Sequence, residues 1–187
     1  MELGAVGVWT PELRYGDRGE ARDAAAELEQ LGYGALWLPG GIGGDIFDAC
    51  AAVLDVTSRV VVATGIVNIW MHDAVDTAAA HHRLVDAHRG RFLLGLGVSH
   101  APLVDAGHAG RYQQPLRAME QYLDALDAAA PPVPVAERVL AALGPRMLGL
   151  ARDRSAGAHP YLVTPAHTAE ARSVLGPAAV LAPEQPV

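Results

Sequence analysis

Seven short apolar runs, rich in β-branched residues, alternate along the chain with segments of helical spacing. The runs cover residues 3–9, 34–39, 60–68, 91–98, 138–144, 157–164 and 179–187. Near-continuous apolar strands separated by amphipathic helices are typical of a parallel sheet that is buried on both faces. The alternation therefore predicts an α/β fold, namely a (β/α)8 TIM barrel of which this chain holds about seven units.

The length of the chain is short for such a barrel. A complete barrel typically has about 250 residues, whereas this chain has 187 and its seventh run reaches the last residue. We therefore expect residues 1–187 to form a single, C-terminally truncated barrel domain without the eighth strand. The first and seventh strands would then have unpaired edges, which promote self-association. On this basis we expect the 187 residues alone to be poorly soluble and inactive.

Composition excludes several classes of protein. The chain is 51% hydrophobic but has no apolar run that approaches the roughly 18 residues of a membrane span. Its N-terminus lacks the basic segment and cleavage site of a secreted protein, and Cys50 is the single cysteine, which fits a reducing cytoplasm. A net charge of −7 without a lysine or arginine block argues against nucleic acid as a partner. We expect a cytoplasmic enzyme that contacts neither membranes nor nucleic acids.

Signals for helix ends accompany the segments between the runs. Asp, Ser and Thr cap helix N-termini, proline favours the first turn, and glycine commonly follows the last. The expected boundary residues are Gly32, Asp73, Pro115, the Thr164–Pro165 pair and the Gly176–Pro177 pair.

Three of the eight histidines lie in or just after the third, fourth and sixth runs. They are His72, His100 and His159. Catalytic side chains of TIM barrels sit at the C-terminal ends of the strands, and a neutral imidazole there acts as an acid or base near pH 7. In contrast, we expect His81, His82 and His88 to be surface or packing residues of a helix, because no carboxylate or cysteine is spaced to complete a metal site with them.

Glycines follow two of the runs. The PGGIGGD segment (39–45) offers unobstructed backbone amides for a phosphate or a flat ring, although an ordinary flexible loop has the same composition. Gly144–Pro145 predicts a helix start whose amides bind an anion, with an ordinary strand-to-helix turn as the alternative. Gly95 and Gly97 lack the third glycine and the first-strand context of a Rossmann fingerprint, so that site is not expected.

These segments together resemble the bacterial luciferase-like monooxygenase superfamily, and within it the branch of oxidoreductases that depend on the deazaflavin coenzyme F420. The resemblance runs from about residue 4 to the last residue. It rests on GVWTPELRYGD (7–17), ELEQLGYGALWLPGG (27–41), VVVATGIVNIWMHD (60–73), GRFLLGLGVSHAPLV (90–104), RVLAALGPRMLGLARDRSAGAHPYLVTPAHT (138–168) and LAPEQ (181–185). Members of the family continue beyond this point with an eighth strand and helix.

The resemblance implies a cofactor site at the C-terminal ends of the strands. The cofactor ring is expected against a bulge in the third strand, at Gly65, Ile66 and Val67 with Asn68 beside it, and this bulge often contains a non-prolyl cis peptide in the family. Gly97 and Ser99 are expected on the ring side. The phosphate-bearing tail is expected at the amides around residues 144–147, that is Gly144, Pro145, Arg146 and Met147.

Two departures from the branch bear on the substrate. Many relatives carry a histidine or an acidic residue where this chain has Gly40–Gly41, and many carry a glutamate where it has His100. His100 is therefore the expected acid–base residue, with His72 or His159 orienting the substrate.

The resemblance implies hydride transfer between F420 and an unknown small organic molecule. An FMN-dependent monooxygenase and a non-catalytic barrel fragment remain the alternatives. A homodimer of the full-length protein is one expected assembly.

Overall fold

The computed structural model describes residues 1–106 and 110–186. Contact clustering divides the chain into two compact units, which we describe separately. The first unit comprises Met1–Val67 and Ala79–Leu94, and the second comprises Asn68–Ala78 and Gly95–Val187. The fold is α/β with parallel strands, and it forms the predicted incomplete TIM barrel. The expectation of a single domain stays a prediction.

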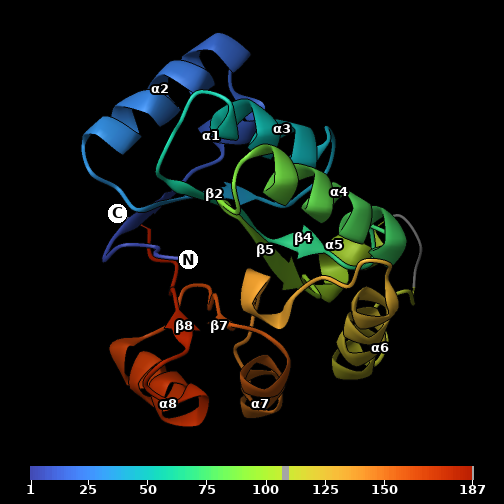
Figure 1. Cartoon of the computed structure of the whole chain (residues 1–187). Coiled ribbons are helices and arrows are strands. Elements are labelled where there is room, and N and C mark those ends of the chain that lie inside the picture. The colour runs from blue at the N-terminus through green and yellow to red at the C-terminus, as the bar shows by residue number, and fades with distance from the viewer. Residues whose placement is uncertain (107–109, 187) are drawn as a thin grey trace. The chain divides into compact units, whose positions relative to one another are not determined.

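The first unit is a parallel sheet with helices packed on it (Figure 1). Strand β2 pairs with β1, with Val8 opposite Leu36, and also with β3, with Leu36 opposite Val62. Strand β3 then pairs with the start of β5, with Val62 opposite Phe92. The elements are β1 (Gly7–Trp9), α1 (Glu12–Tyr15), α2 (Arg18–Gln30), β2 (Ala35–Pro39), α3 (Ile46–Leu54) and β3 (Val61–Gly65), followed by most of α4 (Ala74–Ala87) and the first half of β5 (Phe92–Gly97).

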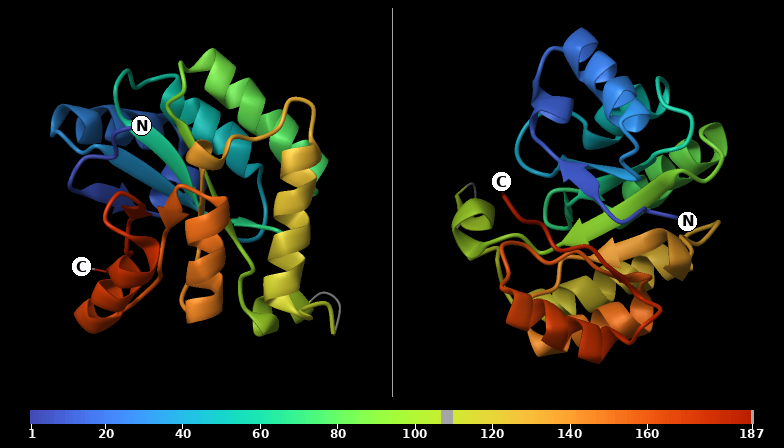
Figure 2. Two further views of the ribbon diagram at one scale, coloured as in Figure 1. Left: turned by 60° about the horizontal axis from the view of Figure 1, so that its bottom comes forward. Right: turned by 90° about the vertical axis from the view of Figure 1, so that its left-hand side faces the viewer.

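The second unit continues from the end of β5. The amide of Ala141 donates to the carbonyl of Leu96 (2.8 Å), and β7 pairs in parallel with both β6 and β8. Helices α6, α7 and α8 lie side by side in it (Figure 2). Its elements are the end of β4 (Val67–Asn68), the start of α4, α5 (Ala101–Asp105), α6 (Pro115–Ala128), the 3₁₀ helix η1 (Val135–Glu137), β6 (Arg138–Leu140), α7 (Pro145–Arg154), β7 (Gly157–Ala158), α8 (Pro165–Leu175) and β8 (Val180–Leu181).

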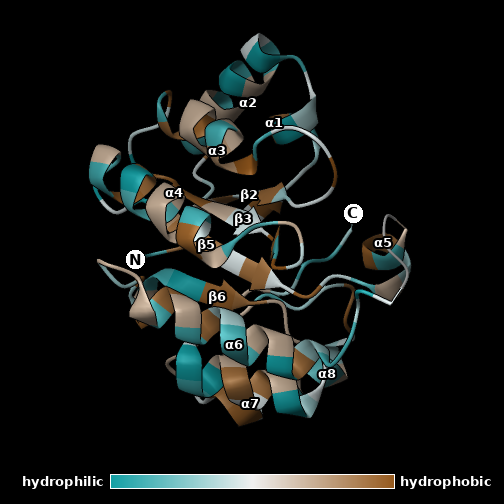
Figure 3. Cartoon of the chain, turned by 90° about the vertical axis from the view of Figure 1, so that its right-hand side faces the viewer, coloured by the Kyte–Doolittle hydropathy of each residue, from teal (hydrophilic) through white to brown (hydrophobic). Residues whose placement is uncertain are grey.

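The strands follow the apolar runs but are shorter. Strands β2 and β5 are buried throughout and occupy most of their runs. Figure 3 colours both strands by the hydropathy of their residues. In contrast, β7 keeps only two residues of the run 157–164, and beyond Pro160, which has no amide hydrogen to donate, the pairing continues only as an isolated parallel bridge between Tyr161 and Glu184. Hydropathy therefore locates each strand and overestimates its length, at the N-terminal end for β1 and at the C-terminal end for β6, β7 and β8.

The expected helix boundaries are confirmed. The Asp73 carboxylate accepts a hydrogen bond from the Val75 amide (2.8 Å) at the start of α4, and the Thr164 hydroxyl accepts one from the His167 amide (3.2 Å) at the start of α8. Gly176 follows α8 with a φ of 84°, a conformation that glycine adopts without steric cost. Within the described residues, no helix has the length and apolarity needed to cross a membrane.

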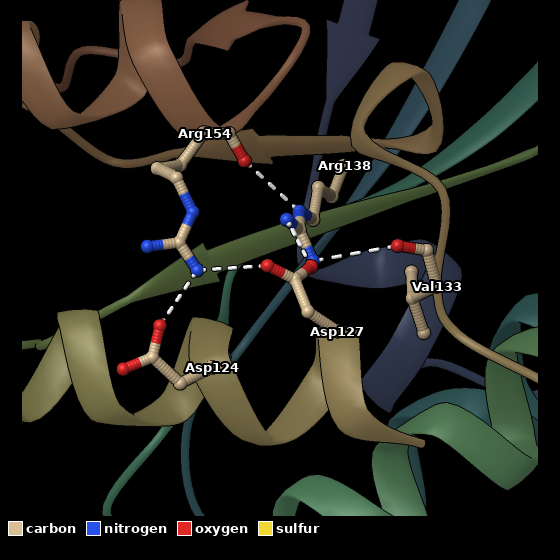
Figure 4. Close-up of polar contacts among 5 residues, drawn as sticks. All are labelled: Asp124, Asp127, Val133, Arg138 and Arg154. Atoms are coloured by element: carbon tan, nitrogen blue, oxygen red, sulfur yellow. Dashed lines mark hydrogen bonds and ion pairs between the residues drawn. The ribbon is translucent and has the colours of Figure 1, made fainter. Parts of the chain in front are cut away.

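A buried arginine ties three elements of the second unit together (Figure 4). The Arg138 side chain of β6 is fully buried, and its guanidinium donates to the Asp127 carboxylate of α6 (2.7 Å) and to the Arg154 carbonyl at the end of α7 (3.0 Å). Arg154 itself pairs with Asp124 and Asp127, each at 2.8 Å. Because this charge is compensated, β6 can begin with an arginine inside the core.

Candidate functional site

The third apolar run is interrupted where the cofactor ring is expected. Strand β3 ends at Gly65, β4 begins at Val67, and the peptide bond between Gly65 and Ile66 is cis. The predicted departure from regular pairing at Gly65–Val67 is therefore confirmed. The proposed contact of these residues with a ring stays a prediction.

Two residues of the first unit fix the backbone at this interruption. The indole N–H of Trp9 donates to the Gly65 carbonyl (3.0 Å), and the amide of Gly40 lies 3.4 Å from the same oxygen. A Cβ added at Gly40 would lie 2.0 Å from the Ile66 carbonyl oxygen, so a side chain there would displace one of the two backbones. Gly40 thus has a packing reason to be glycine, at the position where many relatives are expected to carry a polar side chain.

Asn68 is the first site residue of the second unit and is almost fully buried. Its side-chain oxygen accepts a hydrogen bond from the Trp70 amide (3.0 Å), which fixes the orientation of the carboxamide. The Nδ2 group is buried and has no hydrogen-bond partner among the described residues. A buried donor without a partner is costly, so this group is suited to an acceptor on a bound ligand.

The loop after β5 lies beside Asn68 within the second unit. The Ile69 amide donates to the Gly97 carbonyl (3.1 Å), and the Trp70 indole donates to the Val98 carbonyl (2.8 Å). Ser99 has a φ of 56°, and its carbonyl accepts from the Tyr112 hydroxyl (3.4 Å). The structure therefore brings together the predicted residues Asn68, Gly97 and Ser99.

His100 and His159 have different surroundings in the second unit. His100 is exposed, and its ring centre lies 6.4 Å from that of Tyr161. His159 is buried, and its Nδ1–H donates to the Ala182 carbonyl (2.7 Å), while Nε2 lies 3.8 Å from the Glu184 carboxylate. Burial lowers the pKa of His159 and raises the pKa of Glu184. His159 is therefore suited to positioning, and His100 to proton exchange.

The third predicted histidine, His72, belongs to the turn that follows Asn68. Its backbone amide donates to the Asn68 carbonyl (3.2 Å), as does the Met71 amide (3.0 Å). This turn leads into α4, and it places His72 four residues from the buried carboxamide. Its expected role in orienting a substrate stays a prediction.

The predicted tail site lies at the start of α7. Gly144 precedes the helix, Pro145 occupies its first turn, and no side chain among the described residues caps it. Gly144, Pro145 and Arg146 are exposed, and Met147 is half-buried. The His167 imidazole N–H donates to the Leu143 carbonyl (2.7 Å) and holds the segment just before the helix. The arrangement fits an anion at the first-turn amides.

The histidines of α4 differ in burial and in their neighbours. His81 is fully buried and its ring packs 6.0 Å from that of Phe92, whereas His88 lies 3.8 Å from Asp55. The packing interpretation is confirmed for His81. Within the described part of the chain there is no group of three or more metal-ligating side chains.

Several residues that shape these segments carry no predicted role. They are Trp9, Arg14, Tyr15, Trp70, Tyr112 and Glu184. Trp9 ends β1, Arg14 and Tyr15 belong to the helix that follows it, and Trp70 and Glu184 come after β4 and β8. Positions near strand ends are where barrel sites are built, but they do not indicate which carbonyl or side chain each residue contacts.

Comparisons with solved structures place the fold among flavin and deazaflavin enzymes. An F420-dependent secondary alcohol dehydrogenase, solved with an F420–acetone adduct, matches with a TM-score of 0.73 at 14% identity over 90% of this chain and 64% of that one. The coenzyme F420-dependent tetrahydromethanopterin reductase of Methanopyrus kandleri matches with a TM-score of 0.73 at 15% identity, over 90% of this chain and 59% of that one. The oxygenating constituent of the 3,6-diketocamphane monooxygenase of Pseudomonas putida was solved with FMN. It matches with a TM-score of 0.73 at 11% identity, over 91% of this chain and 61% of that one.

The chain spans less than two thirds of the length of these three structures. No curated protein sequence matches it significantly. A family model described as luciferase-like monooxygenase matches residues 3–175, which is most of the chain. The chain therefore belongs to the luciferase-like monooxygenase family.

Proposed function

We propose that the protein binds coenzyme F420 and transfers a hydride between this cofactor and a small organic substrate. The observation that carries the proposal is the buried Asn68 carboxamide, whose oxygen is fixed by Trp70 and whose Nδ2 group has no partner among the described residues. The ring system of a flavin or deazaflavin carries carbonyl and nitrogen acceptors that match such a donor. The residues present therefore fit the cofactor.

The chain's own residues would have three tasks around the cofactor, which when bound supplies the hydride. Asn68 would donate to an acceptor on the ring, and the amides at the start of α7 would hold an anionic group of the tail. The exposed His100 imidazole would give a proton to the substrate or remove one from it. The protein thus supplies binding, orientation and proton transfer.

Two observations favour F420 over FMN. The uncapped start of α7 offers backbone amides to the anionic tail of the cofactor, and two of the three structures described above depend on F420. The third was solved with FMN, which makes an FMN-dependent monooxygenase the second candidate.

A titration of the full-length protein with each cofactor tests this choice. We expect F420 to quench the protein fluorescence with a micromolar Kd and FMN to bind at least about tenfold more weakly, a difference of about 1.4 kcal/mol. Micromolar binding of FMN without a response to F420 would establish the second candidate instead. Binding of neither cofactor would favour a non-catalytic barrel fragment.

The substitution Asn68→Asp tests the carrying observation. Aspartate keeps the oxygen that accepts from Trp70 and removes the Nδ2 donor, so we expect the Kd for F420 to rise by at least tenfold with little change in helix content. The control is Gln121→Glu, which makes the same change of amide to carboxylate on an exposed face of α6. Equal affinities of the two variants would show that Asn68 does not contact the cofactor.

A further inference from the structure

Two residues of α1 hold the glycine-rich loop 40–44 by its backbone oxygens, all within the first unit. The Arg14 guanidinium donates to the carbonyls of Pro39 (2.6 Å), Gly43 (2.8 Å) and Gly44 (3.2 Å). The Tyr15 hydroxyl donates to the Gly40 carbonyl (2.9 Å). The Arg14 guanidinium also lies 4.8 Å from the centre of the Tyr15 ring, so the two side chains support each other.

The sequence of the loop 40–44 contributes little to its own order. Gly41, Gly43 and Gly44 all have positive φ, and Ile42 between them is 66% exposed. Glycine loses more conformational freedom on ordering than any other residue. The hydrogen bonds from α1 therefore supply order that the loop sequence does not.

The same loop contacts the backbone that is proposed to face the cofactor ring. Gly40, whose carbonyl Tyr15 holds, is the residue whose missing Cβ leaves room for the Ile66 carbonyl, and its amide approaches the Gly65 carbonyl. A displacement of Gly40 toward Ile66 would push the Gly65–Ile66 backbone away. A continuous chain of contacts thus runs from α1 through Gly40 to Ile66.

We infer that Arg14 and Tyr15 are positioning residues, which set the place of the Gly65–Ile66 backbone through the loop 40–44. This inference rests on the proposed function in one respect, namely that Gly65–Ile66 faces the ring. Arg14 fits this role better than lysine would, because a guanidinium reaches several carbonyl oxygens at once in a fixed fork. The positioning role also explains why two side chains of the short helix α1 both donate to backbone oxygens of the same segment.

Hydrogen exchange of the ligand-free protein tests the chain of contacts. We expect Arg14→Gln to speed amide exchange in residues 39–45 and also in residues 63–68, and Tyr15→Phe to do the same to a smaller extent. Arg18→Gln, an exposed arginine at the first position of α2, is the control and should change neither segment. Faster exchange in residues 39–45 alone would overturn the inference, because the loop would then be held without positioning Ile66.

The affinity for F420 tests the functional part. We expect Arg14→Gln to raise the Kd about 5–20-fold, Arg14→Lys to restore the affinity only in part, and Tyr15→Phe to raise the Kd about 2–5-fold. Gly40→Ala should raise it at least tenfold because of the close approach to Ile66, whereas Gly149→Ala in α7, where a Cβ meets open space, should leave it unchanged. If Arg14→Gln alters amide exchange but leaves the Kd for F420 unchanged, Arg14 orders the backbone without affecting cofactor binding, and the functional part of the inference is wrong.

The two measurements separate this inference from the proposed function. If the unaltered protein binds no F420, the proposed function fails, while the exchange data still decide whether Arg14 positions Gly65–Ile66. If F420 binds and the exchange of residues 63–68 does not respond to Arg14→Gln, the proposed function stands and the inference fails.

Discussion

His100 combines a fixed backbone with a free side chain. Its carbonyl accepts hydrogen bonds from the amides of Leu103 and Val104, each at 3.1 Å, and so begins α5. Its imidazole caps no amide of that helix and is exposed. An exposed imidazole on a fixed backbone is accessible to a substrate with which it could exchange a proton.

In the full-length enzyme, the substitution His100→Ala should lower turnover by about 10²–10⁴-fold, because general acid–base groups contribute a factor of that size. The affinity for the cofactor should hardly change. Steady-state kinetics with and without the substitution measure the effect, and His82→Ala on α4 is the matched control. A loss of turnover smaller than threefold would move the proton-transfer role to His72, His159 or another group.

At the scale of the elements, Glu29 joins the end of α2 to the start of β3. Its carboxylate accepts hydrogen bonds from the amides of Ser58 (2.9 Å), Arg59 (2.7 Å) and Val60 (2.9 Å) and from the Ser58 hydroxyl (3.0 Å). Partial burial raises the pKa of Glu29, but these hydrogen bonds outweigh it and lower the pKa from 4.5 to about 2. One side chain thus satisfies amides that precede a buried strand.

The substitution Glu29→Gln should destabilise the chain by about 1–2 kcal/mol at pH 7, less than the roughly 1.5–3 kcal/mol of a buried hydrogen bond to a charged group, because Glu29 is partly exposed to solvent. Because the folded pKa is lowered, this stabilisation is complete above pH 4.5 and is lost as the pH falls toward 2. Urea unfolding at several pH values measures it. Glu27→Gln, on an exposed face of α2, should have little effect. A difference that stays constant down to pH 2 would contradict the explanation.

At the scale of the whole molecule, the buried arginine of β6 joins three elements of the second unit. Arg138 is among the largest fully buried side chains, and it links β6 to the ends of α6 and α7 (Figure 4). The Asp127 carboxylate compensates the charge of Arg138. Partial burial raises the pKa of Asp127, but hydrogen bonds from Arg138 and Arg154 outweigh this effect and lower the pKa below its usual value. Loss of this carboxylate would leave a buried cation without its partner.

The substitution Asp127→Ala should lower the free energy of unfolding by about 1–3 kcal/mol, less than for a fully buried pair because solvent reaches Asp127. Urea denaturation measures the change. Asp153→Ala removes the partner of the exposed Arg152 and should leave the unfolding midpoint unchanged. Equal midpoints for the two variants would show that the buried pair contributes nothing to stability.

The sequence by itself determined the class of fold and the order of its elements. Runs such as 34–39 and 91–98 are apolar on both faces, which only a strand covered on both sides accommodates, and Asp73 and Thr164 cap the helices where their side chains predict. The resemblance to the luciferase-like family placed the irregular backbone at Gly65–Ile66, where it is found. These features depend on local sequence and on burial, which hydropathy reports directly.

Only the tertiary structure decided which atoms meet. The contacts of Arg14 with Gly43, of Gly40 with Ile66 and of Glu29 with Val60 join segments about 25–30 residues apart. Nearly every residue has a backbone amide and carbonyl, so the sequence does not indicate which of these groups a side chain will contact. The tertiary structure likewise distinguished the buried His159, which lies in an apolar run, from the exposed His100, which follows one. Strand position predicts that a residue lies at the edge of the sheet, but burial and hydrogen-bond partners depend on how the chain folds back on itself.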